Sequence, residues 1–323
     1  MRLVTYRVEP DTEPDLAPRL GAVVGDWVVD LAEASDGSLP ETMLAFIEAG
    51  PYALSRARDL LVEARQGWPD GVHDAVPVQN VKLLAPIPWP RKNIVCLGLN
   101  YRDHAAEGAR ARGRELRLPE HPVYFSKPPT CVIGPEEPID YDRRVTEQVD
   151  WEVELTLVIG RRGRDIPPER VFDYLFGYTV ANDVSARDLQ FRHGGQWFKG
   201  KCLDSFAPMG PCIVTADELT DPGGLGIRLR VNGVQKQSSS TREFIFDIPT
   251  MVSVLSAGLT LEPGDLIMTG TPDGVGFARN PPEFLQDGDV VEAEVDQIGI
   301  LRNPVRARRR GYWPPPNALA CEP

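Results

Sequence analysis

Residues 149–160 read VDWEVELTLVIG and predict a β-strand with two unlike faces. Successive strand residues point to opposite faces, so the apolar side chains share one face while Asp150, Glu152, Glu154 and Thr156 share the other. The carboxylates of Glu152 and Glu154 therefore point the same way, roughly 6 to 7 Å apart. This spacing is poor for two like charges but suits two ligands of one divalent ion. A strand with a solvated acidic face would give the same pattern, because charged side chains are mostly exposed.

A second acidic segment lies further along the chain. Residues 176–188, FGYTVANDVSARD, read as an apolar strand that ends at Asn182 and Asp183 before a helix. We expect a capping box of Ser185 and Asp188 to open that helix. Asp183 could complete a three-carboxylate oxygen site, which suits Mg²⁺, Mn²⁺ or Ca²⁺ rather than zinc. A local turn or cap role is the alternative for this residue.

The patterns outside these two segments divide the chain into parts. The N-terminal region has short strand patterns with a hairpin signal at Gly25 and Asp26, followed by helical spacing over residues 39–50 and 52–65. Strand patterns with few helices dominate the chain further on. We therefore expect an α+β protein with three parts: a small N-terminal α/β domain at residues 1–77, a strand-rich catalytic domain at 78–305 and an irregular tail at 306–323.

Composition excludes several classes of function. The 323-residue chain has 42% hydrophobic residues and a formal net charge of -12, which disfavours nucleic acid because phosphate backbones bind Lys and Arg. No segment approaches the roughly 20 apolar residues that span a bilayer, so we expect a cytoplasmic protein with no membrane partner. The five cysteines are scattered and the four histidines form no H-E-x-x-H motif, so any metal should be held by oxygen.

The segment after Asn100 carries a histidine and a carboxylate at helical spacing. His104 and Glu107 are three residues apart, so a helix that starts after Asn100 places both on one face. Glu107 would orient the imidazole and stabilise its protonated form, so that His104 acts as a general base on water. A surface ion pair is the alternative. Tyr101 is a candidate for lining a pocket, although aromatic residues are more often in the core.

Polar residues at two further places could hold a substrate. Arg187 and Gln190 are three apart on the helix that follows Asp183, so both project to one side near the proposed ion. Thr271 lies in the loop TGTPDG at 269–274, whose glycines allow backbone N–H groups to approach a substrate carboxylate. Exposed surface charge and an ordinary tight turn are the respective alternatives.

Seven segments together resemble the catalytic domain of the fumarylacetoacetate hydrolase family, and the likeness is specific because they occur in the same order. They are GLNYRDHAAE (98–107), FSKPPTCVIGP (125–135), DWEVELTLVIG (150–160), NDVSARDLQ (182–190), KCLDSFAPMGP (201–211), LEPGDLIMTGTPDGVG (261–276) and GDVVEAEVDQIGILRNPV (288–305). The resemblance implies a mixed β-sheet of roll or sandwich type, a small N-terminal domain and a homodimer.

The resemblance also assigns roles within the site. It implies that Glu152, Glu154 and Asp183 bind the metal, which in this family is usually Mg²⁺ or Mn²⁺. Lys201 resembles the family lysine that stabilises a developing carbanion or oxyanion, with Lys199 and Lys127 ranked below it. The helix that carries the histidine and glutamate pair resembles a mobile lid in related enzymes.

For activity, the resemblance implies an enzyme that acts on a small 2-oxo acid or 1,3-diketo acid. The expected reaction is Mg²⁺-dependent hydrolysis of a C–C bond in an acylpyruvate or fumarylpyruvate, with an enolate as leaving group and His104 activating water. Decarboxylation of oxaloacetate or isomerisation of a 2-hydroxydienedioate at the same site is the alternative, because these routes share an enolate. A binding protein without turnover is a rival from another class.

Overall fold

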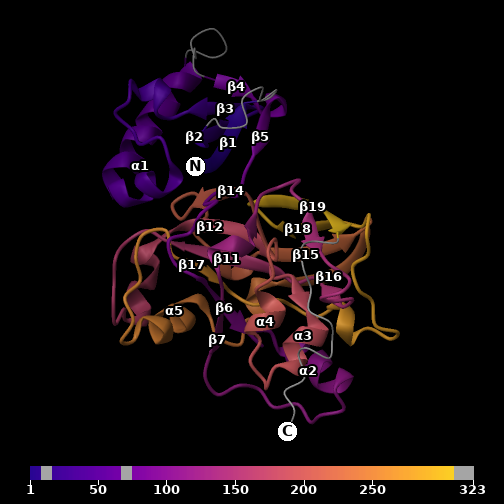
Figure 1. Ribbon diagram of the computed structural model, residues 1–323. Helices are drawn as coiled ribbons and strands as arrows, with labels where there is room; N and C mark the ends of the chain where they lie inside the picture. The colour runs from indigo at the N-terminus through magenta and orange to yellow at the C-terminus, as the bar shows by residue number, and fades with distance from the viewer. Residues whose placement is uncertain (9–16, 67–74, 309–323) are drawn as a thin grey trace, which may run out of the picture.

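The computed structural model describes residues 1–8, 17–66 and 75–308, and β-sheets dominate it (Figure 1). The largest sheet is mixed and has the order β4-β3-β2-β1-β14-β12-β11-β17-β6-β7, with β5 beside β1 and β8 beside β14. A second sheet has the order β16-β15-β18-β19-β9, and β10 pairs with β13. The observed architecture confirms the expected fold: mixed sheets, few helices and a small N-terminal region.

The elements have the following bounds. The large sheet contains β1 (Arg2–Val8), β2 (Arg19–Val24), β3 (Trp27–Asp30), β4 (Ala75–Pro77), β5 (Val81–Leu83), β6 (Ile94–Gly98), β7 (Val123–Lys127), β8 (Val132–Ile133), β11 (Val153–Ile159), β12 (Leu175–Asn182), β14 (Ala207–Thr215) and β17 (Leu266–Met268). The second sheet contains β9 (Ile139–Tyr141), β15 (Gly226–Val231), β16 (Val234–Ser240), β18 (Val290–Val295) and β19 (Gly299–Ala307). The short ladder pairs β10 (Val149–Asp150) with β13 (Ser185–Ala186). The α-helices are α1 (Met43–Gln66), α2 (Arg102–Ala111), α3 (Arg187–Arg192), α4 (Phe198–Lys201) and α5 (Ile248–Ser256).

The N-terminal strands continue into the sheet that carries the candidate site. The predicted hairpin is confirmed, since β2 and β3 pair on either side of Gly25, whose φ of 59° lies in the left-handed region that glycine favours. The two predicted helices are the two halves of α1, which Gly50 interrupts with non-helical torsions. On its other edge β1 pairs with β14, with Leu3 opposite Ile213. The division of the chain at residue 77 stays a prediction, because the ladder of β1 with β14 places residues from both sides of that boundary in one sheet.

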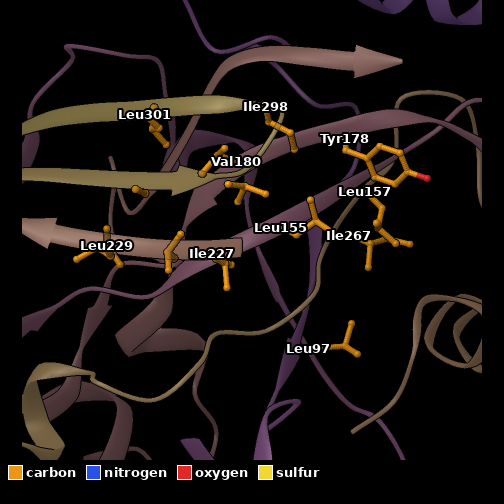
Figure 2. Packing of buried hydrophobic residues seen from close by; sticks show 14 of the residues in the cluster. Leu97, Leu155, Leu157, Tyr178, Val180, Ile227, Leu229, Ile267, Ile298 and Leu301 are labelled. Atoms are coloured by element: carbon orange, nitrogen blue, oxygen red, sulfur yellow. The ribbon is translucent and has the colours of Figure 1, made fainter. Parts of the chain in front are cut away.

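The central strand β11 is buried on both faces. Its apolar face packs against the second sheet, where Leu155 and Leu157 belong to one core cluster with Ile227 and Leu229 of β15 (Figure 2). Burial of each such side chain stabilises the fold by about 1.5–3 kcal/mol. The carboxylate face is covered as well, because Glu154 is only 1% exposed. A solvated acidic face is therefore excluded.

The capping box expected at the start of the helix after Asp183 is absent. Ser185 and Asp188 form no capping box: α3 begins at Arg187, the Ser185 hydroxyl donates to the Asp183 carbonyl, and the Asp188 carboxylate accepts from Thr146. These side chains bind other partners because β13 already fixes the backbone just before the helix.

The C-terminal tail does not begin at residue 306. Strand β19 continues to Ala307, because Arg306 and Ala307 pair with Asp140 and Tyr141 of β9. The rest of the predicted tail, residues 309–323, lies outside the described residues. Within the described ranges, the helices are too short or too polar to cross a lipid bilayer.

Candidate active site

Three carboxylates meet where β11 and β12 lie side by side. Antiparallel pairing sets Glu154 opposite Ala181, and just beyond the ladder the Asp183 amide donates to the Glu152 carbonyl at 2.8 Å. Carboxylate oxygens of Glu152, Glu154 and Asp183 lie within 4.8 Å of one another, and all three side chains are buried. The sheet register thus brings together the three acids that the sequence singled out.

Two buried cations line this cluster. Lys201 Nζ lies 2.8 Å from Glu152 Oε2 and 2.6 Å from Asp183 Oδ2. Arg187 Nη2 lies 2.6 Å from Glu152 Oε1, and its Nε donates to Asp150 at 2.8 Å. Burial alone would raise the pKa of Glu152, but Lys201 and Arg187 outweigh it and hold this pKa well below its usual range. Burial likewise would lower the pKa of each cation, but the neighbouring carboxylates raise both.

A third lysine has a different place. Lys127 Nζ lies 2.7 Å from Asp183 Oδ1 and donates to three backbone carbonyls, those of residues 184, 201 and 206. An ammonium has three donors, so Lys127 has none to spare for a substrate. Lys201 lines the cavity described below, and Lys199 is exposed. The geometry therefore favours Lys201 over both alternatives for contact with a substrate.

Glu154 has no cationic partner in the described part of the chain. Its Oε2 accepts a hydrogen bond from the Gly270 amide at 2.6 Å, and no ion pair involves it. Burial, followed by repulsion from Asp183 and Glu152, raises its pKa well above the usual range. A divalent cation would remove this repulsion, and a set of buried carboxylate oxygens is the donor set that Mg²⁺ and Mn²⁺ prefer. The residues present therefore fit such an ion.

The predicted histidine and glutamate pair is formed on α2. His104 Nδ1 lies 3.0 Å from Glu107 Oε1, and both side chains are largely buried. Glu107 also accepts hydrogen bonds from the amides of Gly274 and Val275, at 2.8 and 3.4 Å. An ionised carboxylate accepts only, so His104 donates through Nδ1 and its neutral form has Nε2 free to accept a proton. Glu107 thus ties α2 to the loop that follows β17.

One cavity is lined by a member of each group, Glu152 and His104, whereas Glu154, Asp183 and Glu107 are not among its lining residues. About 480 Å³ of space between atoms, including the part open to solvent, is lined mainly by residues from α2, α3, α4, the end of β6, β7 and the loop after β17. The predicted residues that line it are His104, Glu152, Arg187, Gln190, Lys201 and Thr271. Arg187 Nη1 donates to Gln190 at 3.0 Å, so the predicted substrate-binding pair is already joined. A small polar acid would therefore meet cations, a carboxylate and the imidazole at once.

One predicted substrate residue lies elsewhere. The Tyr101 ring is buried edge-to-face against Phe244, with ring centroids 5.0 Å apart, and it is not among the residues that line the cavity. Its hydroxyl has no hydrogen-bond partner in the described residues. The structure therefore gives no support to contact between Tyr101 and a substrate.

Two polar residues that the sequence left unassigned hold the site together. Asp150 accepts from Arg187 and from the amides of Gly276 and Phe277, at 2.7 and 3.0 Å. Its place on the acidic face of residues 149–160 was a signal that could have identified it. Gln237 donates to Thr271 and accepts from the Val153 amide, which ties the 269–274 loop to β11. Gln237 lies among other polar residues of β16, so the sequence gives no comparable signal for it.

Comparisons with known proteins identify the family of this chain. Residues 93–306 match the family model described as fumarylacetoacetate (FAA) hydrolase, C-terminal. The chain is 42% identical over 308 residues to a mitochondrial oxaloacetate tautomerase, fahd2, of Xenopus laevis, covering 94% of this chain and 90% of the relative. It is 41% identical to the oxaloacetate tautomerase YisK of Bacillus subtilis, covering 88% and 95%. A solved structure, maleylpyruvate hydrolase from Sphingobium with manganese(II) and pyruvate, is 30% identical with a TM-score of 0.72, covering 96% of this chain and 100% of that one.

Proposed function

Since the chain belongs to the fumarylacetoacetate hydrolase family, we propose that it is a divalent-metal-dependent enzyme that interconverts the keto and enol forms of oxaloacetate. The observation that carries this proposal is one cavity that is lined both by Glu152, a member of the buried three-carboxylate cluster, and by His104, which Glu107 holds. Relatives that are more than 40% identical and are named oxaloacetate tautomerases, among them those of Xenopus laevis and Bacillus subtilis, support this substrate.

The metal would supply the electrostatic part of the reaction. A divalent cation held by Glu152, Glu154 and Asp183 would polarise the 2-oxo group and stabilise negative charge on its oxygen. We propose Mg²⁺ for this role, with Mn²⁺ and Ca²⁺ as the alternatives that the oxygen donors allow. The manganese(II) reported with the maleylpyruvate hydrolase is consistent with this class of ion.

The protein's own side chains would bind the substrate and move its proton. Arg187 and Lys201 donate hydrogen bonds toward substrate oxygens, because both cations line the cavity. In the keto-to-enol direction, His104 Nε2 takes a proton from C3 while Glu107 stabilises the resulting imidazolium. The 2-oxo oxygen then takes a proton from water and the His104 imidazolium returns its proton to solvent, which gives the enol and the neutral histidine; the reverse steps return the ketone. Thr271 and Gln190 complete the polar lining that orients the acid.

Hydrolysis of an acylpyruvate, the reaction that the sequence favoured, is the second candidate. The same Nε2 that takes a carbon-bound proton could take one from water, which then attacks the distal carbonyl. The 30% identical maleylpyruvate hydrolase supports this route. Decarboxylation of oxaloacetate and isomerisation of a 2-hydroxydienedioate need the same enolate and remain alternatives to be tested beside it.

One substrate panel decides among these reactions. Exchange of the C3 protons of oxaloacetate with deuterium, followed by proton NMR, reports tautomerisation. Loss of the diketone absorbance reports acylpyruvate hydrolysis, loss of the dienol absorbance of a 2-hydroxy-2,4-dienedioate reports isomerisation, and pyruvate release from oxaloacetate reports decarboxylation. We expect metal-dependent C3 exchange that excess chelator abolishes and Mg²⁺ or Mn²⁺ restores. If oxaloacetate exchanges no faster than without enzyme, the tautomerase proposal is wrong.

Three further proposals concern the whole protein. We propose a homodimer, which rests on family resemblance, and light scattering at micromolar concentration tests it; a stable monomer would contradict it. We also propose a cytoplasmic location and a division into a small N-terminal domain and a catalytic domain. Fractionation of cells and limited proteolysis near residue 77 test these two proposals.

A further inference from the structure

One cation of the cavity has no carboxylate to neutralise it. Arg187 and Lys201 each form ion pairs with buried acids, as described above. Arg112, which follows α2 and also lines the cavity, forms no ion pair with any acid among residues 1–8, 17–66 and 75–308. Arg112 is exposed to solvent at the edge of this cavity, so its guanidinium is free to bind an anionic group of a ligand.

Two phenyl rings connect this arginine to Arg187. The Arg187 guanidinium carbon lies 4.6 Å from the centroid of the Phe277 ring. Phe277 meets Phe191 edge-to-face, with centroids 5.6 Å apart, and the Arg112 guanidinium carbon lies 5.7 Å from the Phe191 centroid. Arg112 thus stands at one end of a short aromatic floor, and Arg187, which pairs with Glu152 of the carboxylate cluster, stands at the other. This arrangement favours a ligand that is held at the cluster by one end and has an anionic group at the other end.

The position of Arg112 is fixed by the helix that precedes it. Its Nε donates to the Gly108 carbonyl at 2.8 Å, which leaves the terminal nitrogens without a hydrogen-bonding acceptor in the described residues. A Cβ on Gly108 would lie 3.3 Å from Arg112 Nη2, so the absence of a side chain there lets the arginine fold back over the helix. Partial burial, together with the charges of Arg114 and Arg187, lowers the pKa of Arg112.

We propose that Arg112 binds the second carboxylate of a dicarboxylate substrate and so makes the cavity selective for 2-oxo diacids over 2-oxo monoacids. The inference rests on the proposed function, because it takes the 2-oxo acid end of the ligand to be held at the carboxylate cluster. An arginine fork matches a carboxylate with two parallel hydrogen bonds, and this contact would also remove the repulsion that Arg112 feels from its cationic neighbours. Binding through Arg112 positions the substrate and leaves the proton transfer to His104.

The test compares ligands that differ in the second carboxylate. Titration calorimetry with Mg²⁺ would measure binding of 3,3-difluoro-oxaloacetate, which cannot enolise at C3, and of oxalate, which is too short to span the floor. Arg112→Gln should weaken the difluoro compound by about 10- to 100-fold, the usual worth of a hydrogen bond to a charged group, and change oxalate by less than about twofold. Arg112→Lys keeps the charge without the fork and should fall between parent and Arg112→Gln.

A matched control lies in the last turn of α2, two residues before Arg112. Arg110 is exposed and does not line the cavity, so Arg110→Gln removes the same charge from the surface and should change neither affinity. In C3 exchange assays, Arg112→Gln should raise KM for oxaloacetate while exchange of the pyruvate methyl protons is unaffected. Thermal unfolding at the parent temperature would show that each variant is folded.

The outcomes separate the two proposals. Unchanged binding of difluoro-oxaloacetate by Arg112→Gln, or equal weakening of oxalate, overturns the role of Arg112 even if the enzyme tautomerises oxaloacetate. If binding of difluoro-oxaloacetate depends on Arg112 but the parent enzyme does not exchange the C3 protons of oxaloacetate, the diacid site is supported and the tautomerase proposal is rejected. If the parent binds neither ligand in the presence of Mg²⁺, both proposals fail.

Discussion

Replacing Glu107 with Gln should disable the candidate base while leaving the carboxylate cluster intact. In the parent, the carboxylate faces donors on two sides: His104 Nδ1 at 3.0 Å and the Gly274 amide at 2.8 Å. A glutamine amide has one acceptor oxygen and one donor NH₂ group, so it cannot accept from both. If its oxygen stays with Gly274, its NH₂ group faces Nδ1, and the imidazole must carry its proton on Nε2.

That tautomer cannot take a proton from substrate or water. The rate constant kcat should therefore fall by on the order of 10² to 10⁴, the usual contribution of general base catalysis. If the oxygen turns to His104 instead, the half-buried Gly274 N–H loses its acceptor, which would lower the free energy of unfolding by about 1 kcal/mol. Either orientation carries a measurable loss, because the Glu107 side chain is only 12% exposed.

Three measurements on Glu107→Gln check this reasoning. NMR-detected C3 exchange gives kcat, urea unfolding gives the stability change, and calorimetry gives the Mg²⁺ affinity, which should match the parent because Glu107 contacts no member of the cluster. Glu115→Gln is the control, since the Glu115 side chain is 83% exposed and its nearest cation, Arg117, is 3.9 Å away. A Glu107→Gln enzyme with the parent kcat would refute the assignment of His104 as base.

Three other substitutions test separate parts of the site. In steady-state assays, His104→Ala should slow C3 exchange and acylpyruvate hydrolysis by on the order of 10² to 10⁴ and oxaloacetate decarboxylation much less. Hydrolysis of acylpyruvates at the rate of the parent enzyme would contradict this. Glu154→Gln should weaken Mg²⁺ binding in calorimetry. The circular dichroism spectrum should not change, because the substitution relieves repulsion among the carboxylates. An unchanged Mg²⁺ affinity would exclude Glu154 as a ligand. Lys127→Met should lower stability by about 3–5 kcal/mol, because it leaves Asp183 and three carbonyls without this cation, and equal urea midpoints for parent and variant would refute that structural role.

The sequence located the three acids because they depend on local patterns. Alternation along residues 149–160 placed Glu152 and Glu154 on one face, and Asp183 ended the next apolar run. In the structure β11 and β12 are direct neighbours, so the acids predicted from each strand separately lie together in one cluster. The histidine and glutamate pair was predictable for the same reason, since a spacing of three residues fixes contact on a helix.

The parts that sequence reasoning missed depend on contacts between distant segments. Gln237 reaches the Val153 amide across 84 positions, and nothing in its own strand distinguishes it from its polar neighbours. Tyr101 follows a strand that does reach the cavity, but its bridge to Phe244 turns the ring into the core. Arg112 is one of several arginines after α2, and only the fold shows that it lies over Phe191. Local periodicity carries no information on such pairings.

The balance of charge in the site argues that function, more than stability, accounts for its composition. Four buried carboxylates, including Asp150, face three buried cations, and Glu154 is the acid without one. Buried ion pairs seldom stabilise a fold more than apolar side chains of similar size would, since removing charges from water is costly. An additional carboxylate among them destabilises the protein further unless a cation binds there. Charged groups held in this way are typical of active sites, where their interaction with a substrate offsets their cost to the fold.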